Sequence, residues 1–284
     1  MRRILDLSVL CLVGGLVSGC LPAGVTDSEV IPTAGVRFIN AVPDTGGAFG
    51  LDFRFVDIVE NSDTYRATFR NNPITSANVT ASSNIQYKNA KAGSRHFRIF
   101  LDDTLQAAAS TVLKDSTVNL ESGHNYTFLL WGNARSSGAD KMKLTVIDET
   151  VADPGANVAL RVINTTGSPV DVRQYAGTTV PAGATWANVG AYTISNYVTA
   201  PPAQIRFNVQ PAGGGTTLFS DALALIGQAT TVDIEGTPGT TQAGSAVTMV
   251  VFPRSVAGSR ATNFTTIGFT FMWDRRPGRT CPLC

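Results

Sequence analysis

Charge is scarce in this chain of 284 residues. Asp, Glu, Lys and Arg make up only 15% of it, and the 22 basic residues nearly balance the 21 acidic ones. The sequence therefore lacks the basic excess that is typical of nucleic-acid-binding proteins. After residue 20, no apolar run approaches the roughly 18 residues that a membrane-spanning helix needs, so we expect no such helix in the body of the protein.

Cysteine and histidine are also rare. The cysteines are at positions 11, 20, 281 and 284, so the long stretch between them holds no disulfide framework and must be stabilised by packing. The two histidines, His96 and His124, show no metal-ligand spacing. Glycine is abundant at 27 residues. Low charge with many Gly, Thr, Val, Ala and Asn residues is more typical of exported β-proteins than of cytoplasmic enzymes.

The amino-terminal segment predicts export. Two arginines near the start precede the apolar run Leu7–Val17, which is too short to span a bilayer and is typical of a secretory signal. The run leads into LVSGC at residues 16–20, which resembles the lipobox of bacterial lipoproteins. The resemblance implies that residues 1–19 are removed and that Cys20 carries a diacylglycerol and an amino-terminal acyl chain such as palmitate. An ordinary signal peptide with an incidental cysteine is the alternative.

Lipidation would place the protein at the cell envelope. Two or three acyl chains on one residue anchor a protein stably, whereas one chain does not. Leu21 stands where an aspartate would favour the inner membrane, so we expect the outer membrane, on either its periplasmic or its surface face. Residues 20–34 contain two prolines and no periodicity, and we interpret them as a lipidated tether.

A short phrase occurs twice in the chain. Residues 36–41 read VRFINA and residues 160–165 read LRVINT, and each phrase is followed by turn residues. Arg37 corresponds to Arg161 within this repeat, as Ile39 does to Ile163 and Asn40 to Asn164. The repeat predicts a tandem duplication. Residues 149–157, with Pro and Gly at the centre, form a short seam, so we expect the two copies to touch.

Short segments rich in β-branched and aromatic residues predict strands. In the first copy they are residues 51–56, 85–87, 96–101, 117–120, 126–131 and 143–147; in the second they are residues 170–175, 191–193, 204–209, 230–234, 247–252 and 265–271. Only residues 102–111 suggest a helix. We therefore predict an all-β fold of two tandem antiparallel immunoglobulin-like β-sandwiches, at residues 35–150 and 156–273, with an unpacked basic tail at 274–284.

The chain resembles the bacterial DUF4397 family, whose members are often lipid-anchored and often carry tandem copies. The residues that carry this resemblance are VRFINA at 36–41, YKNAKAG at 87–93 and YTFLLWG at 126–132, with WANVGAY at 186–192 in the second copy. The family has no established activity. The resemblance therefore implies export and β-structure but no catalytic residues, and the Gly-rich loops of the second copy depart from the pattern.

Several residue groups are candidates for a site. His96 or His124 with an acid would suit a hydrolase, and the pairs Asp102-Asp103 and Asp148-Glu149 offer oxygen ligands for calcium. We favour hydrogen-bonded histidines and no metal. Cys281 and Cys284 have the spacing of a local disulfide, half a zinc site or a bridge to another chain. Trp131, Trp186, Tyr192, Tyr197 and Trp273 are aromatics that could line a sugar-binding surface, and the candidate glycan-facing set is Trp186, Tyr192 and Tyr197.

The sequence thus predicts a non-catalytic, lipid-anchored envelope protein without a cofactor. In this hypothesis the sandwiches form a binding or structural module for an envelope partner, and its oligomeric state stays open. A carbohydrate-binding surface protein that uses exposed aromatics is the first alternative, and a secreted hydrolase is the second. An exposed coplanar aromatic set would favour the first of these, whereas a pocket that joins His96 to an acid would favour the second.

Overall fold

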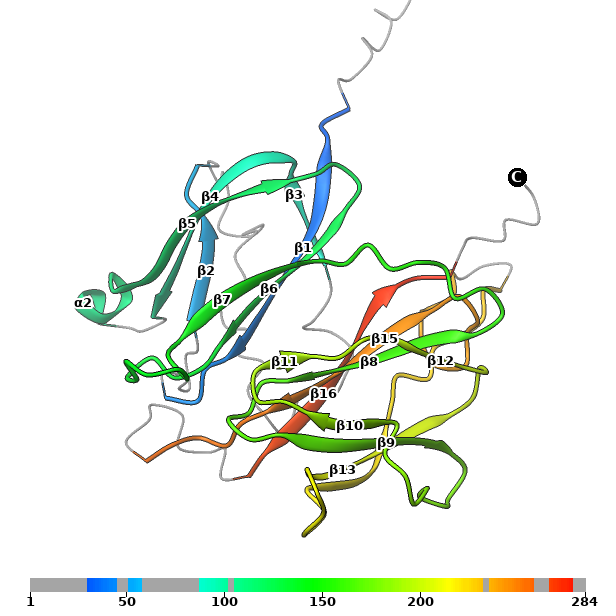
Figure 1. The fold of residues 1–284 in the computed structure, drawn as a ribbon. Helices are drawn as coiled ribbons and strands as arrows, with labels where there is room; N and C mark the ends of the chain where they lie inside the picture. The colour runs from blue at the N-terminus through cyan, green and yellow to red at the C-terminus, as the bar shows by residue number, and fades with distance from the viewer. Residues whose placement is uncertain are drawn as a thin grey trace, which may run out of the picture. The chain divides into compact units, whose positions relative to one another are not determined.

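The computed structural model describes residues 30–44, 51–57, 87–101, 105–231, 235–257 and 266–277. From Thr33 onward the described residues form one compact unit. Strands dominate this unit, and helix α2 (Gln106–Ala109) is a single turn, which confirms the predicted all-β class (Figure 1). In the described part of the chain, no helix is long and apolar enough to cross a bilayer.

The first half of the unit forms two sheets. Strands β1 (Thr33–Ala41), β3 (Lys88–Lys91), β6 (Asn125–Trp131) and β7 (Lys143–Asp148) form one sheet in the order β3-β1-β6-β7. Strands β2 (Leu51–Phe55), β4 (Gly93–Leu101) and β5 (Val112–Leu120) form the other in the order β2-β4-β5. Apolar side chains of both sheets pack into one core cluster, so the pair is a β-sandwich.

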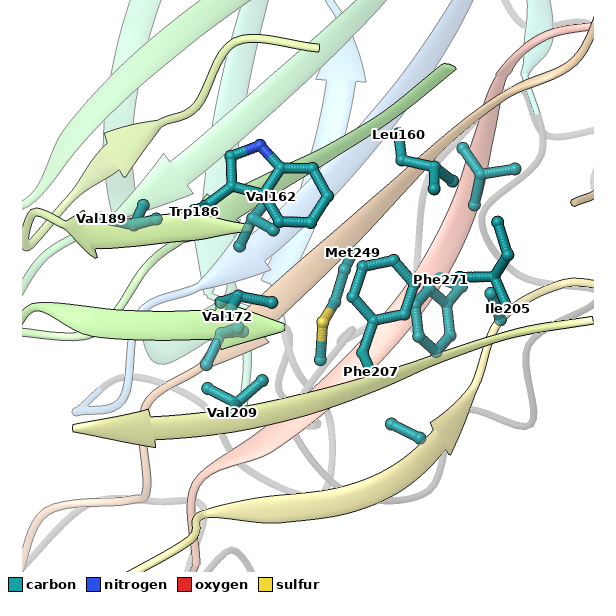
Figure 2. Packing of buried hydrophobic residues seen from close by; sticks show 14 of the residues in the cluster. Leu160, Val162, Val172, Trp186, Val189, Ile205, Phe207, Val209, Met249 and Phe271 are labelled. Carbon is teal, nitrogen blue, oxygen red and sulfur yellow. The ribbon is translucent and has the colours of Figure 1, made fainter. Parts of the chain in front are cut away.

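The second half repeats this pairing. Strands β8 (Val158–Asn164), β11 (Thr193–Ile194), β12 (Val198–Ala200), β15 (Ala246–Phe252) and β16 (Gly268–Arg275) form one sheet in the order β11-β8-β15-β16, with β12 also paired to β8. Strands β9 (Val170–Ala176), β10 (Trp186–Val189), β13 (Ile205–Pro211) and β14 (Phe219–Leu223) form the other, in the order β10-β9-β13-β14. The core between these two sheets is shown in Figure 2.

Each half contains one parallel pair in sheets that are otherwise antiparallel. Strand β1 is antiparallel to β3 but parallel to β6, and β8 is antiparallel to β12 but parallel to β15. A parallel pair requires a crossover between its two strands. In the first half, the chain between β1 and β6 contains β2, β4 and β5, which form the other sheet. The short spacing between successive strands had suggested hairpins and therefore gave no indication of the parallel pair.

Alternation along the repeated phrase explains its composition. Val36 and Phe38 on β1 face the first core, while Ile39 on the opposite face joins a separate cluster. That cluster also contains Leu129 of β6 and Ile163 of β8. The sheet of β1 therefore packs against the sheet of β8 through their outer faces. Both faces of these strands are covered, so they read as nearly continuous apolar runs.

The repeated asparagine ends each phrase in the same way. Asn40 Oδ1 accepts a hydrogen bond from the backbone N–H of Val42 at 3.0 Å, and Asn164 Oδ1 accepts one from Thr166 at 3.0 Å. Asparagine can satisfy a backbone group two residues ahead and so initiates a turn. The equivalence of these two positions in the sequence is thus matched by equivalent geometry.

Several strands differ from the prediction. Strands β10 and β12 were not predicted, β3 lies after the strand expected at residues 85–87, and β5 begins before the one expected at residues 117–120. Strand β16 continues to Arg275, so Asp274 and Arg275 belong to a paired strand rather than to an unpacked tail. Strand β14 (Phe219–Leu223) was not predicted, because its polar residues resemble a loop. The strand predicted at 230–234 lies largely outside the described residues, and residues 230 and 231 are not in a strand.

Candidate functional site

Two equivalent arginines are buried where the two sandwiches meet. Arg37 on β1 is 1% exposed, and Arg161 on β8 is 5% exposed. Each lies on the outer face of its sheet, between the apolar residues of the repeated phrase. An isolated charge at such a position would be very costly, so each guanidinium requires acceptors that replace its lost water.

Each arginine is linked to a carboxylate through a threonine on the neighbouring parallel strand. Arg37 Nε donates to Thr127 Oγ1 at 2.7 Å, and Thr127 Oγ1 donates to Glu149 Oε1 at 2.6 Å. In the second sandwich, Arg161 Nε donates to Thr248 Oγ1 at 2.7 Å, and Thr248 Oγ1 donates to Asp274 Oδ2. Glu149 and Asp274 are equivalent, since each lies two residues after the partner of its threonine in the strand register.

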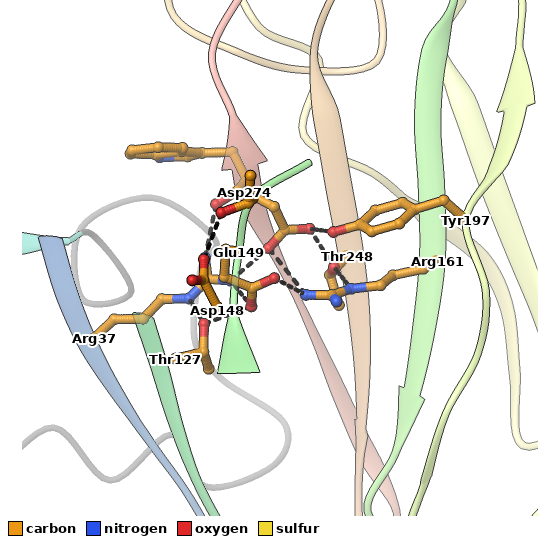
Figure 3. A network of polar contacts seen from close by, with 10 residues as sticks. Arg37, Thr127, Asp148, Glu149, Arg161, Tyr197, Thr248 and Asp274 are labelled. Carbon is orange, nitrogen blue, oxygen red and sulfur yellow. Dashed lines mark hydrogen bonds and ion pairs between the residues drawn. The ribbon is translucent and has the colours of Figure 1, made fainter. Parts of the chain in front are cut away.

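The two sets also cross-link one another. Arg37 Nη2 donates to Glu149 Oε1 at 3.1 Å and also to Asp274 Oδ1 of the other sandwich. Arg161 Nη2 donates to Glu149 Oε2 at 2.6 Å and lies 3.5 Å from Asp274 Oδ1. Figure 3 shows the side chains converging from both sides. Each guanidinium therefore contacts both carboxylates. Glu149 directly follows β7, the last strand of the first sandwich, and Asp274 lies within β16, the last strand of the second.

A tyrosine covers each guanidinium. The Tyr87 ring lies 4.5 Å from Arg37 Cζ, and the Tyr197 ring lies 4.7 Å from Arg161 Cζ. Tyr197 also donates its hydroxyl hydrogen to Asp274 Oδ2 at 2.8 Å. Burial, above all, raises the pKa of both phenols, so they stay neutral near pH 7. We call the following eight residues the arginine network: Arg37, Tyr87, Thr127, Glu149, Arg161, Tyr197, Thr248 and Asp274.

The charges of the arginine network cancel. Burial opposes ionisation of Asp274, but Arg161 and Arg37 outweigh it and hold the pKa of this carboxyl below its usual value. Each carboxylate accepts hydrogen bonds from an arginine and a threonine. Both are therefore engaged in structure. In the part of the chain that the structure describes, no group of three His, Cys, Asp or Glu side chains could hold a metal ion.

The lowered pKa of Asp274 predicts a pH dependence of stability. The unfolded chain takes up a proton on this carboxyl near pH 4, while the folded chain does so only at lower pH. We expect the contribution of Asp274 to the free energy of unfolding to be independent of pH above this range and to be lost as the pH drops through it. Urea titrations between pH 3 and 7 would measure this, and Asp274→Asn should flatten the acid limb. An equally steep limb in the variant would contradict the assignment.

An open cavity of about 590 Å³ lies beside the arginine network. Glu149 and Asp274 contribute to its lining, although both side chains are almost fully buried. Its other walls include an aromatic pair, two amides, an imidazole and a guanidinium, from Tyr87, Trp273, Asn89, Asn125, His124 and Arg276. The cavity therefore combines polar and aromatic groups within the 300–1,000 Å³ or so that is typical of small-molecule sites.

The two histidines lie apart and do different things. His96 contacts Asp115 on the neighbouring strand β5, where both side chains are substantially exposed, and it lines neither cavity described here. His124 Nδ1 lies 2.8 Å from Asp148 Oδ2 and borders the larger cavity. The hydrogen bond with Asp148 raises the pKa of His124. The structure thus brings His124, rather than His96, to a cavity.

The acidic pairs do not form a calcium site in the described residues. Asp148 and Glu149 are adjacent in sequence but point to different partners, His124 for the first and the two buried arginines for the second. The candidates Asp102 and Asp103 lie outside the described residues. Cys20, Cys281 and Cys284, predicted as a lipidation site and a disulfide, lie outside them as well.

The three candidate glycan-facing aromatics do not lie together on one exposed surface. Trp186 is 7% exposed, stacks on Phe207 in the second core and donates its indole N–H to the Asn196 carbonyl. Tyr197 belongs to the arginine network. Tyr192 packs edge-on against Trp131 and borders a second cavity of about 320 Å³. The three rings thus lie in three different places: the second core, the arginine network and the wall of the second cavity.

The arginine network was missed by sequence reasoning, although one signal was available. Arg37 and Arg161 each interrupt an apolar strand at the same position of a repeated phrase. A charge that recurs inside two buried strands indicates a buried partner. The partners were hidden because one lies in the predicted seam and the other in the predicted tail.

Comparison with known proteins supports part of the resemblance. A search of curated proteins gave no match to the chain. The model of the family described as "Domain of unknown function (DUF4397)" matches residues 34–173. This match begins in β1 and ends in β9, so it includes Arg37, Glu149 and Arg161. The chain therefore contains a DUF4397 domain over residues 34–173.

Proposed function

We propose that this chain is a non-catalytic lipoprotein of the cell envelope, attached to a membrane by its lipid anchor. In this proposal Cys20 carries the lipid, in the outer membrane, and the body is a binding or structural module for an envelope partner. The observation that carries the proposal is the arginine network, in which every charged group serves to join the two sandwiches. These contacts and the apolar cluster between the sandwiches support a single body that could present its surface to a partner.

We also propose that the second sandwich is a tandem copy of the DUF4397 domain. Two features support this. The strand order around β8 and β15 repeats that around β1 and β6. The set of one arginine, one threonine, one acid and one tyrosine also occurs once in each sandwich, in the same structural positions.

The anchor is tested by Cys20→Ala. We expect the wild-type protein to fractionate with membranes and to dissolve only in detergent, while Cys20→Ala appears in the aqueous fraction, because loss of the acyl chains removes the only proposed anchor. Cys281→Ala is the matched control and should behave as wild type. Intact-mass spectrometry should show a wild-type chain that begins at Cys20 with added acyl mass. A membrane-bound Cys20→Ala protein, or an unmodified wild type, would contradict the proposal.

The partner is tested separately by cross-linking in intact cells. We expect the wild-type protein to be recovered with a defined envelope protein, and Cys20→Ala to lose that partner through mislocalisation while keeping the same fold. Recovery of wild type without any partner, at a cross-linker dose that captures known envelope complexes, would argue against a binding role.

A further inference from the structure

We infer that the cavity beside the arginine network is a binding site for an uncharged saccharide. The inference goes beyond the proposed function and does not depend on the lipid anchor. Its starting point is the cavity of about 590 Å³ whose lining includes Trp273, Tyr87 and the side chains of Asn89 and Asn125. Of these four residues, only Trp273 was among the aromatics that the sequence suggested for a sugar-binding surface.

The charges around the cavity are matched, which disfavours an ionic ligand. Glu149 and Asp274 are neutralised by the two buried arginines. The His124 imidazole lies against the Asp148 carboxylate, and Arg275 Nη2 donates to Asp153 Oδ2 at 2.7 Å. Arg276 Nη1 lies 3.9 Å from Glu235 Oε1. An anion or a cation would thus compete with an existing partner, whereas a neutral ligand would not.

The amides supply the polar contacts that a hydroxylated ligand needs. Asn89 and Asn125 both line the cavity, and among the described residues neither side chain makes a hydrogen bond. Each amide offers two donors and one acceptor oxygen, which suits neighbouring hydroxyl groups. Gly35 gives the Asn125 amide its room, since a Cβ at Gly35 would lie 2.1 Å from Asn125 Oδ1. The amide is thus positioned against the start of β1.

The aromatic groups supply the apolar contact. The Trp273 and Tyr87 rings meet edge to face with centroids 5.0 Å apart, which fixes the orientation of the half-buried indole. The exposed Arg276 guanidinium lies 4.7 Å from the Trp273 ring centroid. An indole face attracts partial positive charge, whether from a guanidinium or from the C–H groups on one face of a sugar ring. A saccharide would therefore replace Arg276 on the indole.

Fluorescence titration of the mature protein tests the inference. Trp131 and Trp186 are 3% and 7% exposed, so Trp273 is the tryptophan that should report a ligand in the cavity. The probes are three uncharged tetrasaccharides (of N-acetylglucosamine, maltose type and cellulose type), with tetragalacturonate and tetraglucosamine as charged counterparts. We expect saturable binding of at least one uncharged probe, and weaker or no binding of both charged ones.

A matched pair of variants decides whether the cavity is responsible. Asn89→Ala combined with Asn125→Ala should raise the Kd by about tenfold or more, corresponding to the loss of about 1.4 kcal/mol, without changing the thermal midpoint. Asn119→Ala removes an exposed amide on β5 away from the cavity and should leave the Kd unchanged. The inference is overturned if no uncharged probe binds, if a charged probe binds as tightly as the uncharged ones, or if the double variant binds with the wild-type Kd.

Discussion

Replacing Arg37 with alanine is expected to lower the free energy of unfolding by about 3–5 kcal/mol, because it leaves buried carboxylates without their partner. Arg37 donates to Thr127, to Glu149, to Asp274 and to the Trp273 carbonyl, so four acceptors lose a donor at once. Its side chain is 1% exposed, so water cannot reach the freed acceptors unless the two sandwiches separate. Urea unfolding followed by circular dichroism would measure the loss.

The control for Arg37→Ala is Arg98→Ala. Arg98 forms an ion pair with Asp115 on the exposed face of β4 and β5, where the two side chains are 41% and 46% exposed. Surface pairs of this kind contribute little, so the unfolding midpoint should hardly move. Equal losses in the two variants would mean that burial of the arginine network contributes nothing beyond an ordinary surface ion pair.

Substituting Ile163 with aspartate is expected to destabilise the protein by more than about 4 kcal/mol, because it buries a carboxylate with no partner. Ile163 is 0% exposed and packs in the cluster formed by both sandwiches, together with Ile39 and Leu129 of the first. The new charge would face these apolar side chains. Thermal unfolding and the yield of soluble protein would measure the effect.

Val146→Asp provides the matched control for Ile163→Asp. Val146 is also a β-branched residue in a strand, but it is 37% exposed on β7. The same new charge can be hydrated there, so we expect a small change in the thermal midpoint. A stable Ile163→Asp protein would show that the apolar faces of the two sandwiches do not need each other.

Alternation of residues predicted much of the fold. Phe97 and Ile99 of β4, and Phe207 and Val209 of β13, alternate within strands predicted at residues 96–101 and 204–209, and all four face their cores. A strand turns every second side chain to the same face, so burial constrains the register strongly. The repeated phrase was informative for the same reason, since both of its faces are covered.

Long-range polar contacts could not be predicted from pattern. Arg37 bonds to residues 112 and 237 positions away, and no local rule links an arginine in one strand to an acid at a distant strand end. Asp274 was assigned to a tail because the arginines and proline that follow it resemble an unstructured terminus. In the structure, pairing with β15 extends β16 to Arg275 and places Asp274 between the two sandwiches, beside Arg37 and Arg161.

The aromatic residues were misplaced for a related reason. Trp and Tyr suit both binding surfaces and cores, and sequence does not distinguish the two. Of the candidate aromatics, Trp186 fills the second core, whereas Trp273 lines the larger cavity. Trp273 and Asp274 both lie in the part of β16 beyond the predicted strand end at residue 271, so neither position could be placed from the sequence.

A double-mutant cycle between Arg37→Ala and Asp274→Asn tests most directly whether the two sandwiches are joined through the arginine network. The two side chains come from different sandwiches and are in direct contact. We predict that their effects on the free energy of unfolding, measured by urea titration of the full mature chain, are coupled by about 2 kcal/mol. Strictly additive effects would show that the sandwiches are stabilised independently and would contradict this account.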